Sequence, residues 1–196
     1  TWRSAIALFE MGPEYLDRGE GLPEERQMLV GAATGERVEK SWDTPDGAFD
    51  FYDAKGIVEG LLEQFGATGE FAPASDTTFI RGRCASITVN GKRIGVVGEV
   101  APDIMESLDS QRPEVPMFEI DIVAFAGAIG GGATPVSFET FTRYPESYRD
   151  LALLVDESTP ADAVVKIIER NRLVGRASIV DLFRGEGVGD GKKSLA

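Results

Sequence analysis

Residues 83–100 read RCASITVNGKRIGVVGEV, and they fix the first element of the fold. Two runs rich in β-branched residues flank the dipeptide Asn90-Gly91. Asn-Gly is typical of a type I′ turn, because both central residues of that turn need a positive φ. The stretch therefore predicts an antiparallel hairpin with strands over 83–89 and 92–100.

Two apolar runs of strand length precede this hairpin. The first covers 5–12 and is stopped by Gly12-Pro13, and the second covers 27–33. Runs of this length bounded by turn residues are typical of buried strands. We expect the two strands to be neighbours in one sheet.

The spacing of apolar residues changes from strand-like to helical over 50–65. One apolar stripe follows the helical period there, an aspartate stands near its start, and Gly66 follows its end. A short helix is expected from Pro102, since proline is favoured at the first helical position. Alternation of apolar and acidic residues over 116–122 predicts a half-buried strand.

A glycine cluster closed by a proline, residues 127–135, predicts a flexible linker. It lacks both the Gly-Lys-Ser/Thr ending and the G-x-G-x-x-G spacing of phosphate-binding loops. We therefore expect a first domain over 1–126 and a second over 136–196.

The second domain shows the order strand, helix, strand, strand. Thr159 is expected to cap the helix, with Pro160 at its first position. This order is the opening of a ferredoxin-like split βαβ fold, of which the second helix and last strand are missing, so the domain is expected to continue past Ala196. The strands are expected over 149–155, 177–183 and 192–196.

The composition excludes several kinds of chemistry. The 196 residues include no histidine and a single cysteine, Cys84. Ser-His-Asp and Cys-His catalysis and histidine-ligated or multi-cysteine metal sites are therefore excluded, and we expect no metal site. No apolar run approaches the roughly 20 residues that span a bilayer, so a soluble, cytoplasmic protein without membrane contact is expected.

The formal net charge of −13 is concentrated in the first part of the chain. Residues 1–133 hold 11 Lys+Arg and 23 Asp+Glu, a net of −12, and residues 134–196 hold 9 and 10, a net of −1. The first part should repel a phosphate backbone. Nucleic-acid contact is therefore expected only from the second part or from a partner chain.

Several motifs resemble, in order and over nearly the whole chain, those of the bacterial phenylalanyl-tRNA synthetase beta chain. LFEMG, DFYDAKGIVE, IGVVGEVAP and FEID resemble the family's LFEIG, DFFDLKGVVE, IGYLGELHP and FELD. Two histidines usual in the family are replaced, one around 79–83 and one by Ala101. The four motifs lie at 8–12, 50–59, 94–102 and 118–121, and the stretches 144–153, 181–185 and 191–196 resemble the family's ferredoxin-fold anticodon-binding domain.

The resemblance implies an α+β fold. An antiparallel-sheet domain like the catalytic domain of class II synthetases would be followed by a truncated ferredoxin-like domain. It also implies the catalytic alpha chain and the phenylalanine tRNA as partners in a heterotetramer of two alpha and two beta chains. ATP and Mg²⁺ would serve the assembled enzyme, and none would bind this segment.

No catalytic residue is expected in this chain. A class II site needs arginines on its motif 2 strand and motif 3 turn, because the phosphates of ATP require positive charge there. The strand over 5–12 has no arginine, Arg3 precedes it, and Arg81 and Arg83 match neither motif.

The candidate tRNA-binding residues are cations and an aromatic ring of the second domain, a combination that suits unpaired bases and phosphates. They are Arg143, Tyr144, Arg149, Arg184, Lys192 and Lys193. A structural ion pair of Arg149 with Asp150 remains an alternative. For Lys55 we weigh an anion ligand against an ordinary helix-surface lysine, and Cys84 is expected to be an inert core thiol.

Two other functions stay open. One is a stand-alone structural or regulatory module whose ferredoxin-like part binds a small ligand. The other is an independent ATP-dependent ligase, which the missing arginines disfavour.

We expect the purified chain alone to catalyse no phenylalanine-dependent ATP–pyrophosphate exchange, because it lacks arginines placed for the phosphates of ATP. Exchange above the background of a protein-free control would contradict this.

Overall fold

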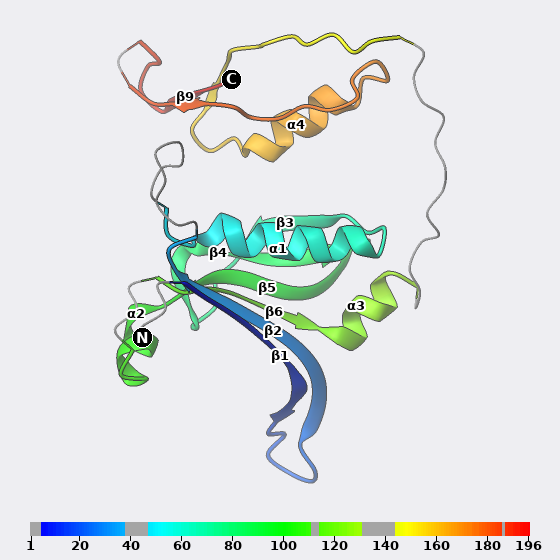
Figure 1. Cartoon of the computed structure of the whole chain (residues 1–196), viewed down its shortest axis with the longest axis vertical. Coiled ribbons are helices and arrows are strands. Elements are labelled where there is room, and N and C mark those ends of the chain that lie inside the picture. The colour runs from blue at the N-terminus through cyan, green and yellow to red at the C-terminus, as the bar shows by residue number, and fades with distance from the viewer. Residues whose placement is uncertain (1–4, 38–46, 111–113, 131–143, 186) are drawn as a thin grey trace. The chain divides into compact units, whose positions relative to one another are not determined.

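The structure is a computed structural model that describes residues 5–37, 47–110, 114–130, 144–185 and 187–196. The chain divides into two compact units, Thr1–Phe138 and Glu139–Ala196. Figure 1 shows the elements of both units along the chain.

The first unit is built on a six-stranded sheet in the order β1-β2-β6-β5-β4-β3, with every neighbouring pair antiparallel. The expected pairing of the first two strands is confirmed, from Ala5 opposite Gly35 to Leu16 opposite Glu24. The short strand β3 has no clear periodicity and was not expected. The strands are β1 (Ala5–Leu16), β2 (Glu24–Gly35), β3 (Gly69–Pro73), β4 (Phe79–Val89), β5 (Lys92–Val100) and β6 (Pro116–Asp121).

The hairpin predicted from Asn90-Gly91 is confirmed. Val89 pairs with Lys92, and the two turn residues have φ of 50° and 74°. Both angles lie in the left-handed region that the type I′ turn requires.

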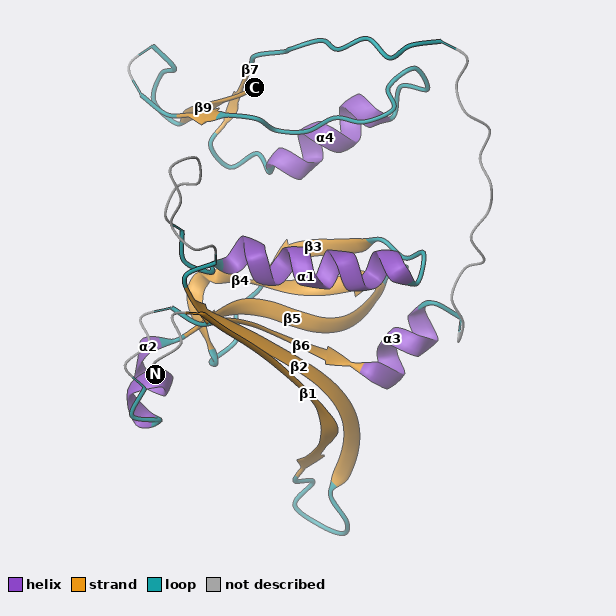
Figure 2. Ribbon diagram, viewed as in Figure 1, coloured by secondary structure: helices purple, strands orange, loops and turns teal. Residues whose placement is uncertain are grey.

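Helix α1 (Phe51–Gln64) matches the predicted helix over 50–65 to within a residue at either end. Asp50 and Asp53 form a reciprocal capping box, which satisfies backbone donors at the helix start. The helix lies over β5 and β6 (Figure 2). It buries Ala54, Val58 and Leu62. Gly56 has open space where a side chain would stand, so it does not mediate close packing.

Two shorter helices complete the first unit. Helix α2 (Pro102–Ser107) packs Ile104 and Met105 against the second core, formed by Phe79, Cys84, Val96 and Val100. Helix α3 (Ile122–Ala128) starts at the Asp121 cap and buries Phe125 in the main core.

Helix α3 was missed, because a seven-residue apolar run beside a glycine cluster carries little helical signal. Gly127 and Ala128, the first residues of the predicted linker over 127–135, belong to this helix, so the linker prediction is wrong there. Residues 131–135 lie outside the described part of the chain.

The second unit contains a three-stranded antiparallel sheet in the order β7-β9-β8 and one helix. The predicted order of strand, helix, strand and strand is confirmed, but the strands are shorter than predicted. The elements are β7 (Leu153–Asp156), α4 (Ala161–Glu169), β8 (Leu182–Phe183) and β9 (Lys192–Leu195).

Two local predictions in this unit are wrong. The helix is preceded by Pro160 without a side-chain cap, because Thr159 lies in a turn in which its amide binds the Asp156 carbonyl at 2.9 Å. The strand expected over 177–183 is regular only at its end, where the β9 register offers partners.

Gly95 and Gly60 offer a matched test of the packing. A Cβ at Gly95 would lie 2.1 Å from the carbonyl oxygen of Glu119, whereas Gly60 on α1 has open space. We expect Gly95→Ala to destabilise the first unit by about 3 kcal/mol, and Gly60→Ala to stabilise it by about 0.5–1 kcal/mol. Urea unfolding followed by circular dichroism measures both, and equal midpoints would contradict the close contact of β5 with β6.

Candidate nucleic-acid interface

Of the candidate residues that precede β7, Tyr144 and Arg149 are described and exposed. Arg143 lies outside the described residues, and Tyr144 is 84% exposed. Arg149 donates to the carbonyl of Tyr148 at 2.7 Å, and no ion pair joins it to Asp150 among the described residues. The alternative of a structural ion pair at this position is therefore not supported.

The other candidate cations gather at the corner that follows β7. Arg184 binds both carboxylate oxygens of Glu157, with Nε at 3.0 and 3.1 Å and Nη2 at 2.7 Å. Hydrogen bonding to the Arg184 guanidinium holds the pKa of Glu157 below its ordinary value. Lys192 Nζ lies 3.8 Å from a carboxylate oxygen of Asp156.

Lys193 is an interior residue, which corrects its prediction as an RNA contact. Its side chain is 8% exposed, and Nζ donates to the Glu157 carbonyl at 2.8 Å. Strand β9 alternates, so Lys193 and Leu195 point into the unit while Lys192 and Ser194 point the other way. The Lys193 ammonium therefore holds the corner after β7 and does not lie on the surface.

The outward face of this small sheet carries an aromatic platform that the sequence did not reveal. Ser194 pairs with Leu154 on one side and with Phe183 on the other, so these three side chains share one face. Phe183 is 50% exposed and Leu154 is 56% exposed. We call Leu154, Phe183 and Ser194 the outward row.

Gly185 leaves room for the ring of Phe183. A Cβ at that glycine would lie 3.0 Å from the ring. Asp181, just before β8, accepts a hydrogen bond at its carboxylate from the Leu182 amide at 2.8 Å. The period-two alternation in β7 and β9 was the available signal for this row, but it becomes readable only when the register is known.

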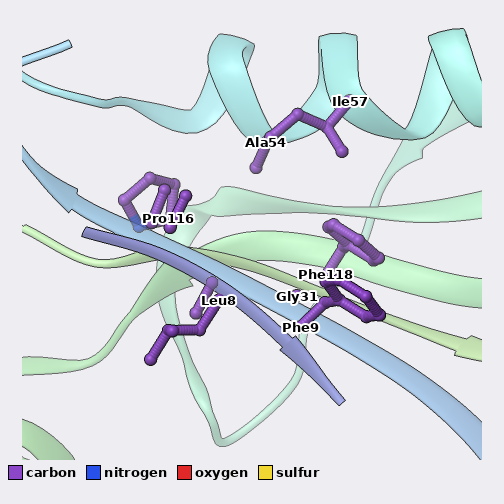
Figure 3. Close-up of a pocket in the computed structure, with 10 residues that line it drawn as sticks. Leu8, Phe9, Gly31, Ala54, Ile57, Pro116 and Phe118 are labelled. Atoms are coloured by element: carbon purple, nitrogen blue, oxygen red, sulfur yellow. The ribbon is translucent and has the colours of Figure 1, made fainter. Parts of the chain in front are cut away.

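The first unit carries exposed apolar side chains along β1, where Leu8 is 70%, Phe9 76% and Met11 62% exposed. Beside them an apolar groove of about 190 Å³ lies between α1 and the β1–β2 pair (Figure 3). Its lining residues are Ala7, Leu8, Phe9, Gly31, Ala32, Ala33, Ala54, Ile57, Pro116 and Phe118.

The remaining singled-out residues have structural contacts. Arg83 bonds the buried Glu99 at 2.5 Å, and Lys55 pairs with Glu59 and lies 4.6 Å from the centroid of the Phe71 ring. Cys84 is buried, which raises the pKa of its thiol, as expected for an inert core cysteine.

In the described part of the chain no helix is long and apolar enough to cross a membrane, and no cluster of acidic or cysteine side chains has a geometry that could hold a metal.

Comparisons with known proteins bear on both units. The small antiparallel unit with its open face falls within a match of residues 142–196 to the ferredoxin-fold anticodon binding domain. Residues 3–122 match the phenylalanyl tRNA synthetase beta chain CLM domain. The chain therefore belongs to the phenylalanyl-tRNA synthetase beta chain family.

Curated relatives agree with this assignment. The chain is 37% identical to the phenylalanine–tRNA ligase beta subunit of Geobacillus kaustophilus, 34% to that of Syntrophus aciditrophicus and 33% to that of Geobacter sulfurreducens. Each match covers 97% of this chain and 24% of the relative. The chain thus spans about a quarter of the length of these relatives.

Lys193 and Lys192 provide a test of the corrected assignment. Lys193→Ala should destabilise the second unit by about 1–3 kcal/mol, because the Glu157 carbonyl loses its donor inside the protein. Lys192→Ala, at the surface, should change the stability by less than about 0.5 kcal/mol. Urea unfolding monitored at NMR signals of the second unit gives both changes in unfolding free energy. Equal changes for the two variants would contradict the burial of Lys193.

Proposed function

We propose that this chain is a non-catalytic part of the beta subunit of a phenylalanine–tRNA ligase. Its first unit supports the alpha subunit, and its second unit binds the anticodon region of the phenylalanine tRNA. The assembled enzyme, a heterotetramer of two alpha and two beta chains in the cytoplasm, would use ATP and Mg²⁺. The first unit would then be related to class II synthetase catalytic domains but would lack their catalytic residues.

The observation that carries the RNA-binding part is the outward row of the second unit. An anticodon loop presents unpaired bases, and such bases stack on exposed aromatic rings. Phe183 supplies the ring and Leu154 extends the apolar surface beside it. The Ser194 hydroxyl, between them, can donate to or accept from a base edge.

Charge around the outward row fits the same role. The Asp181 carboxylate can accept a hydrogen bond from a base N–H. Arg149 and Lys192 are exposed, and Lys192 lies on the same side of β9 as Ser194, so both cations can contact phosphates. Arg184 is half exposed although it binds Glu157, and its charge remains available to the RNA.

The first unit suits protein contact better than RNA contact. Its net charge of −12 opposes a phosphate backbone, whereas its apolar β1 surface suits a protein partner. The alternative of a stand-alone regulatory module gains no support from the relatives named above, which are ligase subunits.

We expect Phe183→Ala in the assembled enzyme to raise the KM for tRNA by about ten-fold or more, since one stacked base contributes about 1–3 kcal/mol. Phe183→Tyr should keep most of the affinity, because the ring is retained. Phenylalanine activation should be unchanged in both variants.

Leu173→Ala is the matched control, because Leu173 is 84% exposed in the same unit but lies outside the outward row. Aminoacylation kinetics with varied tRNA measure the effect. If the Phe183→Ala enzyme has the same KM for tRNA as the Leu173→Ala control, the outward row is not part of the RNA interface.

A further inference from the structure

Strand β1 is a long, apolar strand at an open sheet edge. It has 12 residues and stands at the end of the strand order, with β2 as its neighbour. No strand of the described residues pairs with its other edge. Leu8, Phe9 and Met11 are mostly exposed, and they lie on both faces of the strand because successive side chains alternate.

Such an edge is a template for another strand. Along its outer edge, alternate backbone N–H and C=O groups have no ladder partner among the described residues, because the others face β2. Natural proteins usually shorten, charge or cover edges of this kind. On β1 the one backbone feature of the described strand that opposes pairing with another strand is Pro13, near the end of the strand. Pro13 has no N–H to donate, so an incoming strand would use the alternate N–H groups of Ala5–Gly12 that point away from β2.

The apolar groove lies beside this edge, on the side of β1 that faces α1. Phe9 and the half-exposed Ile57 form its walls, and the small residues Gly31 and Ala54 line it (Figure 3). A Cβ at Gly31 would lie 2.4 Å from the ring of Phe118, so the glycine is required by the ring beneath. The hollow has room for about one apolar side chain.

The other side of β1 is acidic. Glu10 and Glu14 are exposed there, and neither forms an ion pair among the described residues. The nearby Arg18 and Arg26 are both occupied by Glu24. This charge opposes RNA, and it opposes a second copy of the chain, which would bring the same two carboxylates and a net charge of −13.

We propose that a partner protein adds an extended strand to the β1 edge over Ala5–Gly12. That strand carries lysine or arginine on the side of Glu10 and Glu14, and it places an apolar side chain in the groove. The inference rests on the proposed role of the first unit in supporting the alpha subunit, and it specifies the contact as strand addition.

Hydrogen exchange tests strand addition directly. The chain is measured alone and in complex with the alpha subunit from the same genome. Backbone pairing should slow exchange of the alternate amides over Ala5–Gly12 that point away from β2 by about ten-fold or more on binding. Docking through side chains alone leaves those amides unprotected.

Charge reversal tests the chemistry of the partner strand. Glu10→Lys with Glu14→Lys should weaken the complex by about ten-fold, since two attractive contacts become repulsive. Asp103→Lys with Glu106→Lys, on α2, is the matched control and should leave the affinity unchanged. Circular dichroism of each variant confirms that the fold is kept.

The outcomes separate the inference from the proposed function. A complex that forms without protection of Ala5–Gly12, or that tolerates reversal at Glu10 and Glu14, would overturn the strand addition and leave the role of the first unit intact. Failure of the unmodified chain to bind the alpha subunit would overturn that role. Protection of these amides in the longer beta chain without any partner would show that the edge is paired within the chain, which also overturns the inference.

Discussion

The first unit depends on the packing of helix α1 against the central strands β5 and β6. Val58 and Leu62 of the helix and Val97 and Ile120 of the strands have no exposed surface. Burial of side chains of this size contributes about 1.5–3 kcal/mol each. Because this contact lies at the centre of the sheet, the hairpin β1–β2 is joined to the rest of the sheet through β2 alone, and its outer strand keeps exposed apolar side chains.

The second unit depends on the corner after β7. Glu157 receives Arg184 at its carboxylate and Lys193 at its carbonyl, so one residue joins the end of β7 to β8 and β9. Lys193 thus uses inside the protein a positive charge that the sequence alone would assign to RNA. They also hold the three short strands in the register that places Phe183, Ser194 and Leu154 in one row.

The parts of the fold that were predictable carry strong local signals. Asn90-Gly91 and the helical stripe of α1 each determine their structure within a few residues, so hairpin and helix were predicted correctly. Helix α3 and strand β3 are short, and tertiary contacts stabilise them more than their own sequences do. The site was harder to predict, because a shift of one residue exchanges the two faces of a strand, and Lys192 and Lys193 cannot be told apart without the register.

The proposed function divides binding between the two units, with protein contact assigned to the acidic first unit and RNA contact to the nearly neutral second unit. The most direct measurement is crosslinking of the phenylalanine tRNA anticodon loop to the assembled enzyme, with the sites mapped by mass spectrometry. The proposed function predicts crosslinks after residue 143, centred on Phe183 and the outward row. Crosslinks from the anticodon loop mainly to residues 5–128 would contradict it.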